Sequence, residues 1–322
     1  MFSQTRTLEI YEIYKKSGSY DQAGRELGIS KESVRRAVRM VNNKDKKKEQ
    51  FDSSLDSTVF KLIERYTPEE LKLIANGFQL QTETYKPIHN FNGQPVKIGV
   101  LTDLHIGSKY TESERIYEAF EEFNRSEVDM VMICGDVTEG LSNRPGHIYE
   151  CSQIGYEAQK DKAIEILGQW DNSPMYMIDG NHDRWYIKSA GACIVKDICE
   201  NIENAEFIGH DVGEIQISPS VKIMLWHGED GSSYSLSYRL QKIIESLSGG
   251  TKPNVMFCGH THKYCNIFER NIYTVSCGSI QRQTPWMRGK RLSAHVGFSI
   301  FEMEIHDTGI GRFKHEWFPF YV

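Results

Sequence analysis

The spacing of apolar residues along the chain changes near residue 95. Before this point apolar residues recur at helical intervals, and the predicted helices cover residues 7–16, 21–27, 31–41 and 56–79. Beyond it, short apolar runs predict strands. These cover residues 96–101, 128–134, 175–178, 221–226, 255–258, 272–275 and 298–305, with helices predicted over 112–124, 156–170, 193–202 and 234–248. Strands that alternate with helices and then predominate indicate a mixed α/β sheet core covered by helices.

The first forty residues have the spacing of a small all-α helix-turn-helix. Gly28 ends the second predicted helix, and Ser30 stands where the third needs an N-cap. The small residues Ala23 and Gly24 suit a close contact between two helices. This arrangement leaves polar side chains outside on the third helix, facing DNA: Lys31, Ser33, Arg35, Arg36 and Arg39. The alternative is a helical bundle with a solvated basic face that serves dimerisation or protein contacts.

The segment after these helices reads as a connection. Residues 42–50 contain no apolar side chain and several lysines, which is typical of a linker or a frayed helix end. Residues 56–79 predict two helices, with Pro68 in the first turn of the second. Their apolar faces suit packing on one neighbour or pairing of two chains. We therefore expect a helix-turn-helix over 1–45, a linker and helical connector over 46–92, and an α/β domain over 93–322.

Charge is distributed unevenly. The net charge is −6, yet residues 1–48 carry 12 lysines and arginines against 6 acidic residues, which leaves −12 for residues 49–322. A basic N-terminal segment joined to an acidic remainder indicates that the two parts bind different partners.

The cysteines and apolar runs bear on the compartment. The seven cysteines include no CxxC pair, which predicts free thiols in a reducing compartment. No apolar run approaches the roughly 18 residues of a membrane span, and the first residues lack the apolar core of a signal peptide. We expect a cytoplasmic protein with no membrane contact.

Five of the predicted strands end in residues that suit metal binding. In chain order these are Asp103 and His105, then Asp136, then Asn181, His182 and Asp183, then His227, and last His260 and His262. Because loops at the carboxyl ends of strands converge, we expect these side chains to meet at one sheet edge. So many carboxylates and imidazoles would repel or lose hydration unless a cation lay among them. Carboxylates mixed with imidazoles suit manganese, iron or zinc, and two such ions commonly serve phosphate-ester hydrolysis.

These motifs together resemble the calcineurin-like metallophosphoesterases over about residues 93–305. The matching sequences are Asp103-Leu104-His105, Gly135-Asp136, Gly180-Asn181-His182-Asp183, His227 and Gly259-His260-Thr261-His262. The resemblance implies a four-layer αββα sandwich of two mixed sheets flanked by helices. It also implies two divalent metal ions, for which we expect Mn²⁺ ahead of Fe, Zn or Mg. Asp103, His105 and His262 would hold one ion, Asn181, His227 and His260 would hold the other, and Asp136 would bridge them.

The same resemblance implies a catalytic role for His182. It would act as general acid or stabilise charge at the leaving-group oxygen, with Asp183 available to orient it. The alternative is that the two residues only support the loop that carries Asn181.

The metal motifs do not choose among protein phosphatases, nucleotide phosphodiesterases and DNA nucleases. The basic N-terminal segment favours DNA as the substrate, and the strand-end motifs resemble the nuclease subunit of the bacterial SbcCD repair complex. That group tends to carry a histidine where Glu139 stands, and no segment that would dock an ATPase partner is evident. Candidate substrate contacts are Arg144, His147, Arg184, Trp286 and Arg288.

We therefore expect a two-metal phosphodiesterase that cuts DNA, as an endo- or exonuclease, and is brought to it by the helix-turn-helix. The alternative is a phosphatase or a cyclic-nucleotide or nucleotide phosphodiesterase whose N-terminal domain mediates assembly. The sequence leaves homo-oligomer formation open. Metal-dependent cleavage of DNA, compared with cleavage of nucleotides, separates the two hypotheses.

Overall fold

The computed structural model describes residues 4–38, 41, 84–85, 95–229, 231, 235–247 and 252–321. Contacts divide the chain into two compact units, residues 1–80 and 81–322, which we call the N-terminal unit and the α/β unit. The predicted linker over 42–50, the predicted connector over 56–79 and Arg39 lie outside the described residues. The three domain ranges drawn from the sequence stay predictions.

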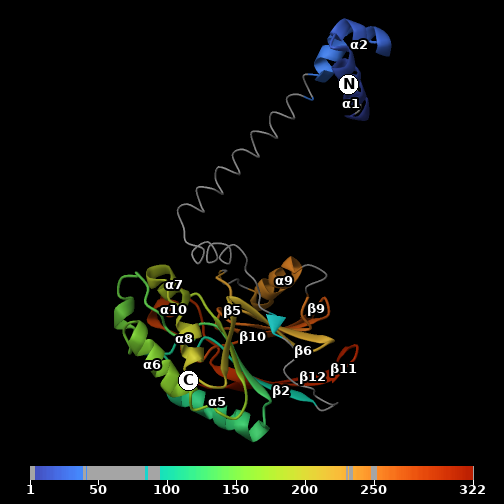
Figure 1. The fold of residues 1–322 in the computed structure, drawn as a ribbon. Coiled ribbons are helices and arrows are strands. Elements are labelled where there is room, and N and C mark those ends of the chain that lie inside the picture. Colours follow the sequence, from blue (N-terminus) through green and yellow to red (C-terminus); the bar gives the residue numbers. More distant parts are fainter. Residues whose placement is uncertain are drawn as a thin grey trace. The chain divides into compact units, whose positions relative to one another are not determined.

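Three helical segments form the described part of the N-terminal unit: α1 (Gln4–Ser17), α2 (Tyr20–Leu27) and residues 31–38 (Figure 1). The turn after α2 needs glycine twice. Gly28 has a φ of 66°, and a Cβ on Gly24 would lie 2.8 Å from the carbonyl oxygen of Ile29. The Ser33 N–H donates to Ser30 Oγ, so the predicted N-cap is confirmed. The helices enclose a small core made by Ile10, Ala23, Val34, Ala37 and Val38.

Two six-stranded sheets form the centre of the α/β unit (Figure 1). The first sheet has the order β12-β11-β2-β3-β4-β5. Its strands β2 to β5 are parallel neighbours, and β11 pairs antiparallel with both β2 and β12. Its strands are β2 (Val96–Leu101), β3 (Met130–Cys134), β4 (Met175–Asp179), β5 (Ala205–His210), β11 (Gly297–His306) and β12 (Gly309–Pro319).

The second sheet has the order β1-β6-β7-β8-β10-β9. In it, β7, β8 and β10 are parallel neighbours, while β6 and β9 pair antiparallel to β7 and β10. Its strands are β1 (Thr84–Tyr85), β6 (Val212–Ser218), β7 (Val221–Trp226), β8 (Val255–Cys258), β9 (Tyr264–Glu269) and β10 (Ile272–Cys277).

Helices cover the outer faces of both sheets (Figure 1). The helices α5 (Ser113–Ser126), α6 (Tyr156–Leu167) and α8 (Ile194–Glu200) pack on the first sheet, and α9 (Leu236–Ser246) packs on the second. Along β3 the side chains alternate between layers: Met130 and Met132 enter the core between the sheets, whereas Val131 and Ile133 face the helices. This four-layer sandwich confirms the predicted fold.

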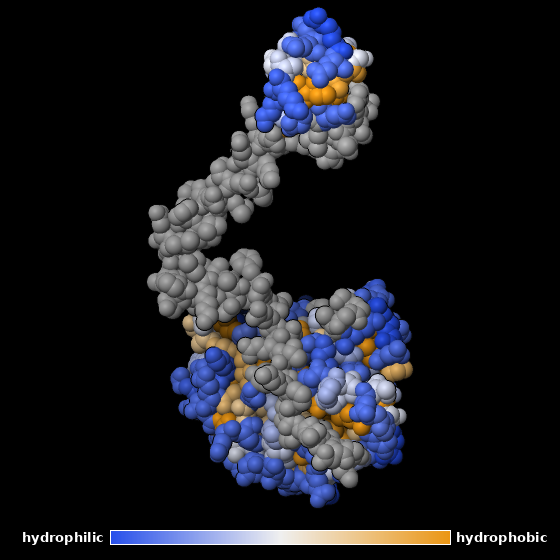
Figure 2. Space-filling model, turned by 45° about the vertical axis from the view of Figure 1, so that its right-hand side comes forward, coloured by the Kyte–Doolittle hydropathy of each residue, from blue (hydrophilic) through white to orange (hydrophobic). Residues whose placement is uncertain are grey.

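The surface of the described residues is mixed. On the face that Figure 2 shows, hydrophilic residues cover most of it, with smaller apolar areas between them. Within the described ranges, no helix is both long and apolar enough to cross a bilayer. All seven cysteines are free thiols, as predicted, and Cys134 and Cys258 are buried in β3 and β8.

Candidate metal centre

The sequence-predicted metal ligands lie at the carboxyl ends of five strands, but these strands belong to two sheets. Asp103 and His105 follow β2, Asp136 follows β3, and Asn181 follows β4, all in the first sheet. The remaining ligands follow two strands of the second sheet: His227 after β7, and His260 and His262 after β8. The expectation of one sheet edge is therefore wrong. The site forms where the strand ends of two packed sheets meet.

Two groups of donor atoms face each other in this junction. In the first, His262 Nε2 lies 3.3 Å from Asp103 Oδ1 and 3.1 Å from His105 Nε2. In the second, Asn181 Oδ1 lies 2.8 Å from His260 Nδ1 and 3.2 Å from His227 Nε2 (His227 and Asn181 are thus neighbours across the two sheets). The two groups match the two sets of ligands that the sequence motifs imply.

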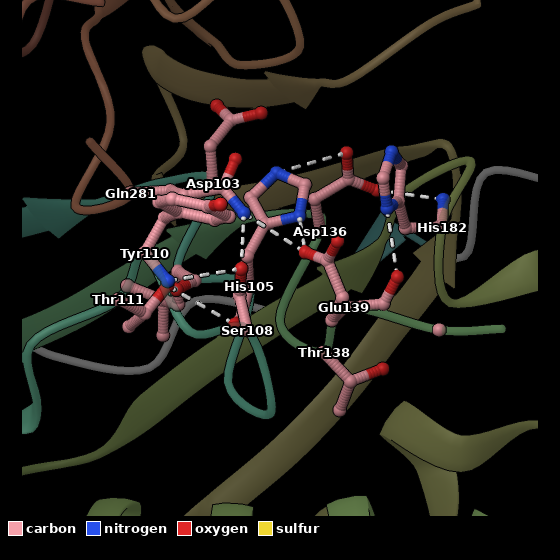
Figure 3. A network of polar contacts seen from close by, with 12 residues as sticks. Asp103, His105, Ser108, Tyr110, Thr111, Asp136, Thr138, Glu139, His182 and Gln281 are labelled. Atoms are coloured by element: carbon pink, nitrogen blue, oxygen red, sulfur yellow. Dashed lines mark hydrogen bonds and ion pairs between the residues drawn. The ribbon is translucent and has the colours of Figure 1, made fainter. Parts of the chain in front are cut away.

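Asp136 lies between the two groups. Its Oδ2 is 3.2 Å from His227 Nε2 and 3.6 Å from His105 Nε2. Figure 3 shows the carboxylates of Asp136 and Glu139 both reaching the His105 ring. One carboxylate oxygen near donors of both groups has the position that a bridging ligand requires.

The backbone at the centre is strained. Non-glycine residues seldom adopt positive φ, yet five of the donors do so: Asp103 (50°), His105 (47°), Asp136 (46°), His260 (76°) and His262 (54°). Such conformations persist where the surrounding structure enforces them, and they concentrate at functional sites. Here the strain turns side chains at strand ends toward a common point.

The electrostatics fit a pair of divalent cations. Burial alone would raise the pKa of Asp103, but His262 and His227 lower it to about 2. Burial opposes a charge on His105, yet its hydrogen bond with Glu139 raises the pKa of the imidazole to about 9. The carboxylates thus draw positive charge into a buried space, and a metal ion would displace the protons. The Nε2 atoms of His105 and His262 also point at each other. This arrangement suits a metal ion bound by both imidazoles better than it suits packing in an apolar core.

Sequence reasoning missed what holds the ligands in place. Glu139 is 2% exposed, and its Oε2 lies 2.9 Å from both His105 Nδ1 and Gln281 Nε2. Its Oε1 lies 2.9 Å from His147 Nε2. The bond to Nδ1 leaves Nε2 of His105 free to bind a metal. The one available signal was an acidic residue three positions after Asp136.

A buried arginine ties two ligand loops together. Arg239 of α9 is 4% exposed and donates to the carbonyl oxygens of His227 and Gly259, which precedes His260. The helical pattern of α9 gave no sign of this role.

His182 lies at the centre, but Asp183 does not orient it. The His182 Nδ1 is 2.8 Å from the carbonyl oxygen of Glu139, and its ring packs 4.0 Å from the ring of Trp185. Burial lowers the pKa of His182 to about 4. The Asp183 carboxylate instead accepts the backbone N–H groups of Val137, Thr138 and Gly180. The expected Asp183–His182 pair is therefore corrected: Asp183 shapes the loops.

The candidate substrate residues divide into two sets. Arg144 and Trp286 line a cavity of about 450 Å³ that most of the donor residues also line: His105, Asp136, Asn181, His260 and His262. Outside its lining, Arg184 forms ion pairs with acidic residues, His147 is buried against Glu139, and Arg288 is exposed on α10 (Pro285–Gly289). These three residues are not brought to the cavity, contrary to the sequence-based interpretation.

A four-layer αββα sandwich with paired carboxylate and imidazole donors at the junction of its sheets defines the class of metal-dependent phosphoesterases. The family model of the calcineurin-like phosphoesterase superfamily domain matches residues 96–296. The chain belongs to this superfamily. It is therefore a phosphoesterase with a site for divalent metal ions.

The chain shares low sequence identity with the known proteins that it resembles. The chain is 24% identical to the DNA polymerase II small subunit of Archaeoglobus fulgidus over 256 residues, covering 65% of this chain and 52% of that one. It thus spans about half the length of this relative. Similar solved structures include an archaeal phosphodiesterase (16% identity, 69% of this chain and 100% of that one, TM-score 0.41). Another is the phosphoesterase YfcE of E. coli (18% identity, 68% of this chain and 98% of that one, TM-score 0.39).

Proposed function

We propose that this protein is a phosphodiesterase that cuts DNA, and that the N-terminal unit is the helix-turn-helix that binds it. The observation that carries the DNA part is the third helical segment of that unit. Lys31, Arg35 and Arg36 are exposed on it, while Val34 and Ala37 are buried in the core beneath. A helix that is anchored on one face and basic on the other suits the major groove.

The basic side chains of this segment can exchange their present carboxylate partners for DNA phosphates. Lys31 pairs with Asp21 at 2.7 Å and Arg35 with Glu32 at 3.6 Å, with every one of these side chains at least half exposed. Exposed ion pairs contribute little stability, so DNA phosphates can replace the carboxylates. Ser33 is less free, because its hydroxyl bonds Ser30 Oγ in the cap. The similarity to a DNA polymerase subunit supports an association with DNA.

The chemistry follows from the donor set. Divalent ions supply Lewis acidity that polarises a phosphoryl oxygen and makes water a nucleophile near neutral pH. We favour Mn²⁺, because carboxylate, amide and imidazole donors without thiolate suit it. Asp103, His105 and His262 would hold one ion, Asn181, His227 and His260 the other, with Asp136 shared.

His182 supplies the remaining function. With Nδ1 held by the Glu139 carbonyl, Nε2 is the ring nitrogen left for the bound ester. Because Nδ1–H donates to that carbonyl, Nε2 carries a proton only in the imidazolium form, which the negative charge of a bound ester would favour; that proton would pass to the leaving oxygen or stabilise its charge. Trp185, packed on the ring, fixes the direction of the imidazole.

The test uses the purified full chain with Mn²⁺ on single-stranded DNA, double-stranded DNA and a panel of nucleotides and cyclic nucleotides. We expect cleavage of DNA that stops on chelation and returns with metal. Hydrolysis of nucleotides alone would overturn the nuclease proposal and favour the small-molecule phosphodiesterase.

A further inference from the structure

An exposed indole shares the cavity of the metal centre. Trp286 is 43% exposed, and the cavity of about 450 Å³ that it lines also contains Asp136 and His182. A volume of this size lies within the roughly 300–1,000 Å³ of small-molecule pockets. Because 43% of Trp286 is exposed beside buried ligands and Arg144 lies over its ring, part of the indole surface is covered by protein and a large part is left for a partner.

The support beneath this indole is rigid. Pro285 occupies the first turn of α10, and the side chain of Thr284 caps it by accepting the N–H of Met287 at 3.1 Å. Met287 is 6% exposed, and its carbonyl oxygen accepts the N–H of Leu292. A fixed aromatic face loses little entropy when a second flat ring stacks on it.

The other walls of the cavity offer little positive charge near the indole. Among the described lining residues, Arg144 is the one lysine or arginine. Its guanidinium lies 5.7 Å from the centroid of the Trp286 ring, and Glu150 holds it through two bonds of 2.8 and 3.1 Å. A paired arginine does not neutralise a row of phosphates. The lining combines aromatic and apolar side chains, such as Trp286, Met287 and Leu292, with polar ones, such as Glu150 and Thr284, and this mixture fits a flat ring with polar edges.

We propose that Trp286 is a stacking platform for one unpaired nucleobase next to the phosphate that is cut. This inference rests on the proposed function and narrows its substrate to single-stranded DNA or frayed ends. In a duplex each base face is covered by its neighbours, so a base must leave the stack before an indole can reach it. Stacking on an aromatic side chain tolerates every base, which predicts cutting with little sequence preference.

The experiment compares substrates with and without bases. The full chain is assayed with Mn²⁺ on a single-stranded oligonucleotide, on the same sequence as a duplex, and on an oligomer of abasic sites. We expect Trp286→Ala to lower kcat/KM on the single strand about 10- to 100-fold, and to leave the abasic oligomer unchanged. Trp286→Phe keeps a flat ring and should restore most of the activity. Phe268→Ala removes an aromatic that is 58% exposed outside the cavity lining and serves as the matched control.

A binding measurement keeps this inference separate from the nuclease proposal. Calorimetry compares deoxyadenosine monophosphate with deoxyribose 5-phosphate on wild type and Trp286→Ala. We expect the base to tighten binding to wild type, and the advantage to disappear in the variant. Equal losses on base-bearing and abasic substrates, or an unchanged advantage of the base, would overturn the stacking site. If wild type binds the base through Trp286 but cuts no DNA, the nuclease proposal fails and the subsite stands.

Discussion

The N-terminal unit and the metal centre place the residues to which we propose functions in opposite ways. In the N-terminal unit, Lys31, Arg35 and Arg36 are exposed on a regular helix whose apolar residues pack inward. In the metal centre, Asp103 and Asp136 are buried, and both have a left-handed backbone. In the first region the placement of these residues costs the fold nothing, whereas in the second it requires burial of charge and a strained backbone.

This difference teaches where mutations should act. Side chains at the centre are held by several partners each, so a single change should alter metal binding or turnover by large factors. In the proposed helix-turn-helix, side chains on the exposed helix would act one by one through charge, so their loss should change DNA affinity modestly and stability hardly at all. Four substitutions test this division.

The largest effect is expected for Asp136→Asn, which removes the carboxylate shared by the two donor groups. Metal-dependent turnover should fall by about 10³-fold or more, because a bound metal contributes several kcal/mol to the transition state. Asparagine tolerates a left-handed backbone and can still accept the His182 N–H, so the fold should persist. Steady-state assays at saturating Mn²⁺ measure the loss, with circular dichroism as the control for folding. Turnover within tenfold of wild type would contradict a bridging role.

Next in size is His182→Asn. The amide can keep the hydrogen bond to the Glu139 carbonyl but cannot transfer a proton, so kcat should fall about 10²- to 10⁴-fold. Metal content, measured by plasma emission spectroscopy, should match wild type. Unchanged turnover would remove the catalytic role, and loss of metal would show that His182 supports the ligands instead.

A smaller effect is expected for Glu139→Gln, which keeps the shape of the side chain but loses the charge that faces His105 and His147. Affinity for Mn²⁺ should fall about 10- to 100-fold, as is usual when the group that orients a metal ligand is changed. Calorimetric titration measures this change. The matched control is Glu245→Gln, an exposed glutamate of α9 that pairs with Lys242. Equal metal affinity in wild type and Glu139→Gln would show that His105 needs no support.

The smallest effect is expected in the N-terminal unit. Arg36→Ala should weaken DNA binding a few-fold and lower the slope of log affinity against log salt by about 1. The free energy of unfolding should change by less than about 0.5 kcal/mol, since the residue is exposed. Fluorescence anisotropy with a labelled duplex measures binding. Arg25→Ala, an exposed arginine on α2, is the control and should bind like wild type. A slope that Arg36→Ala leaves unchanged would count against the helix-turn-helix.

The sequence predicted the central strands and missed the edges. The strands β2, β7 and β8 begin and end where predicted, because buried positions dominate them and give apolar runs. By contrast, β5, β9 and β12 were not predicted. Each lies at a sheet edge, where apolar and polar residues mix and no continuous run forms. The unpredicted β6 carries the same kind of alternation.

The same limit applies to the site. Strand ends are visible in a sequence, so Asp103, Asp136 and His227 could be chosen before any coordinates. The pairing of Glu139 with His105, and of Arg239 with two carbonyl oxygens, depends on how loops and a helix fold over the junction. No spacing rule encodes such contacts.

The number of Mn²⁺ ions bound to the metal-stripped chain tests the central claim most directly. Electron paramagnetic resonance during a Mn²⁺ titration counts the bound ions and reports whether two of them are magnetically coupled. The account predicts two ions per chain, coupled through Asp136 in wild type and at most one retained in Asp136→Asn. Binding of a single uncoupled ion to wild type, or of none, would contradict it.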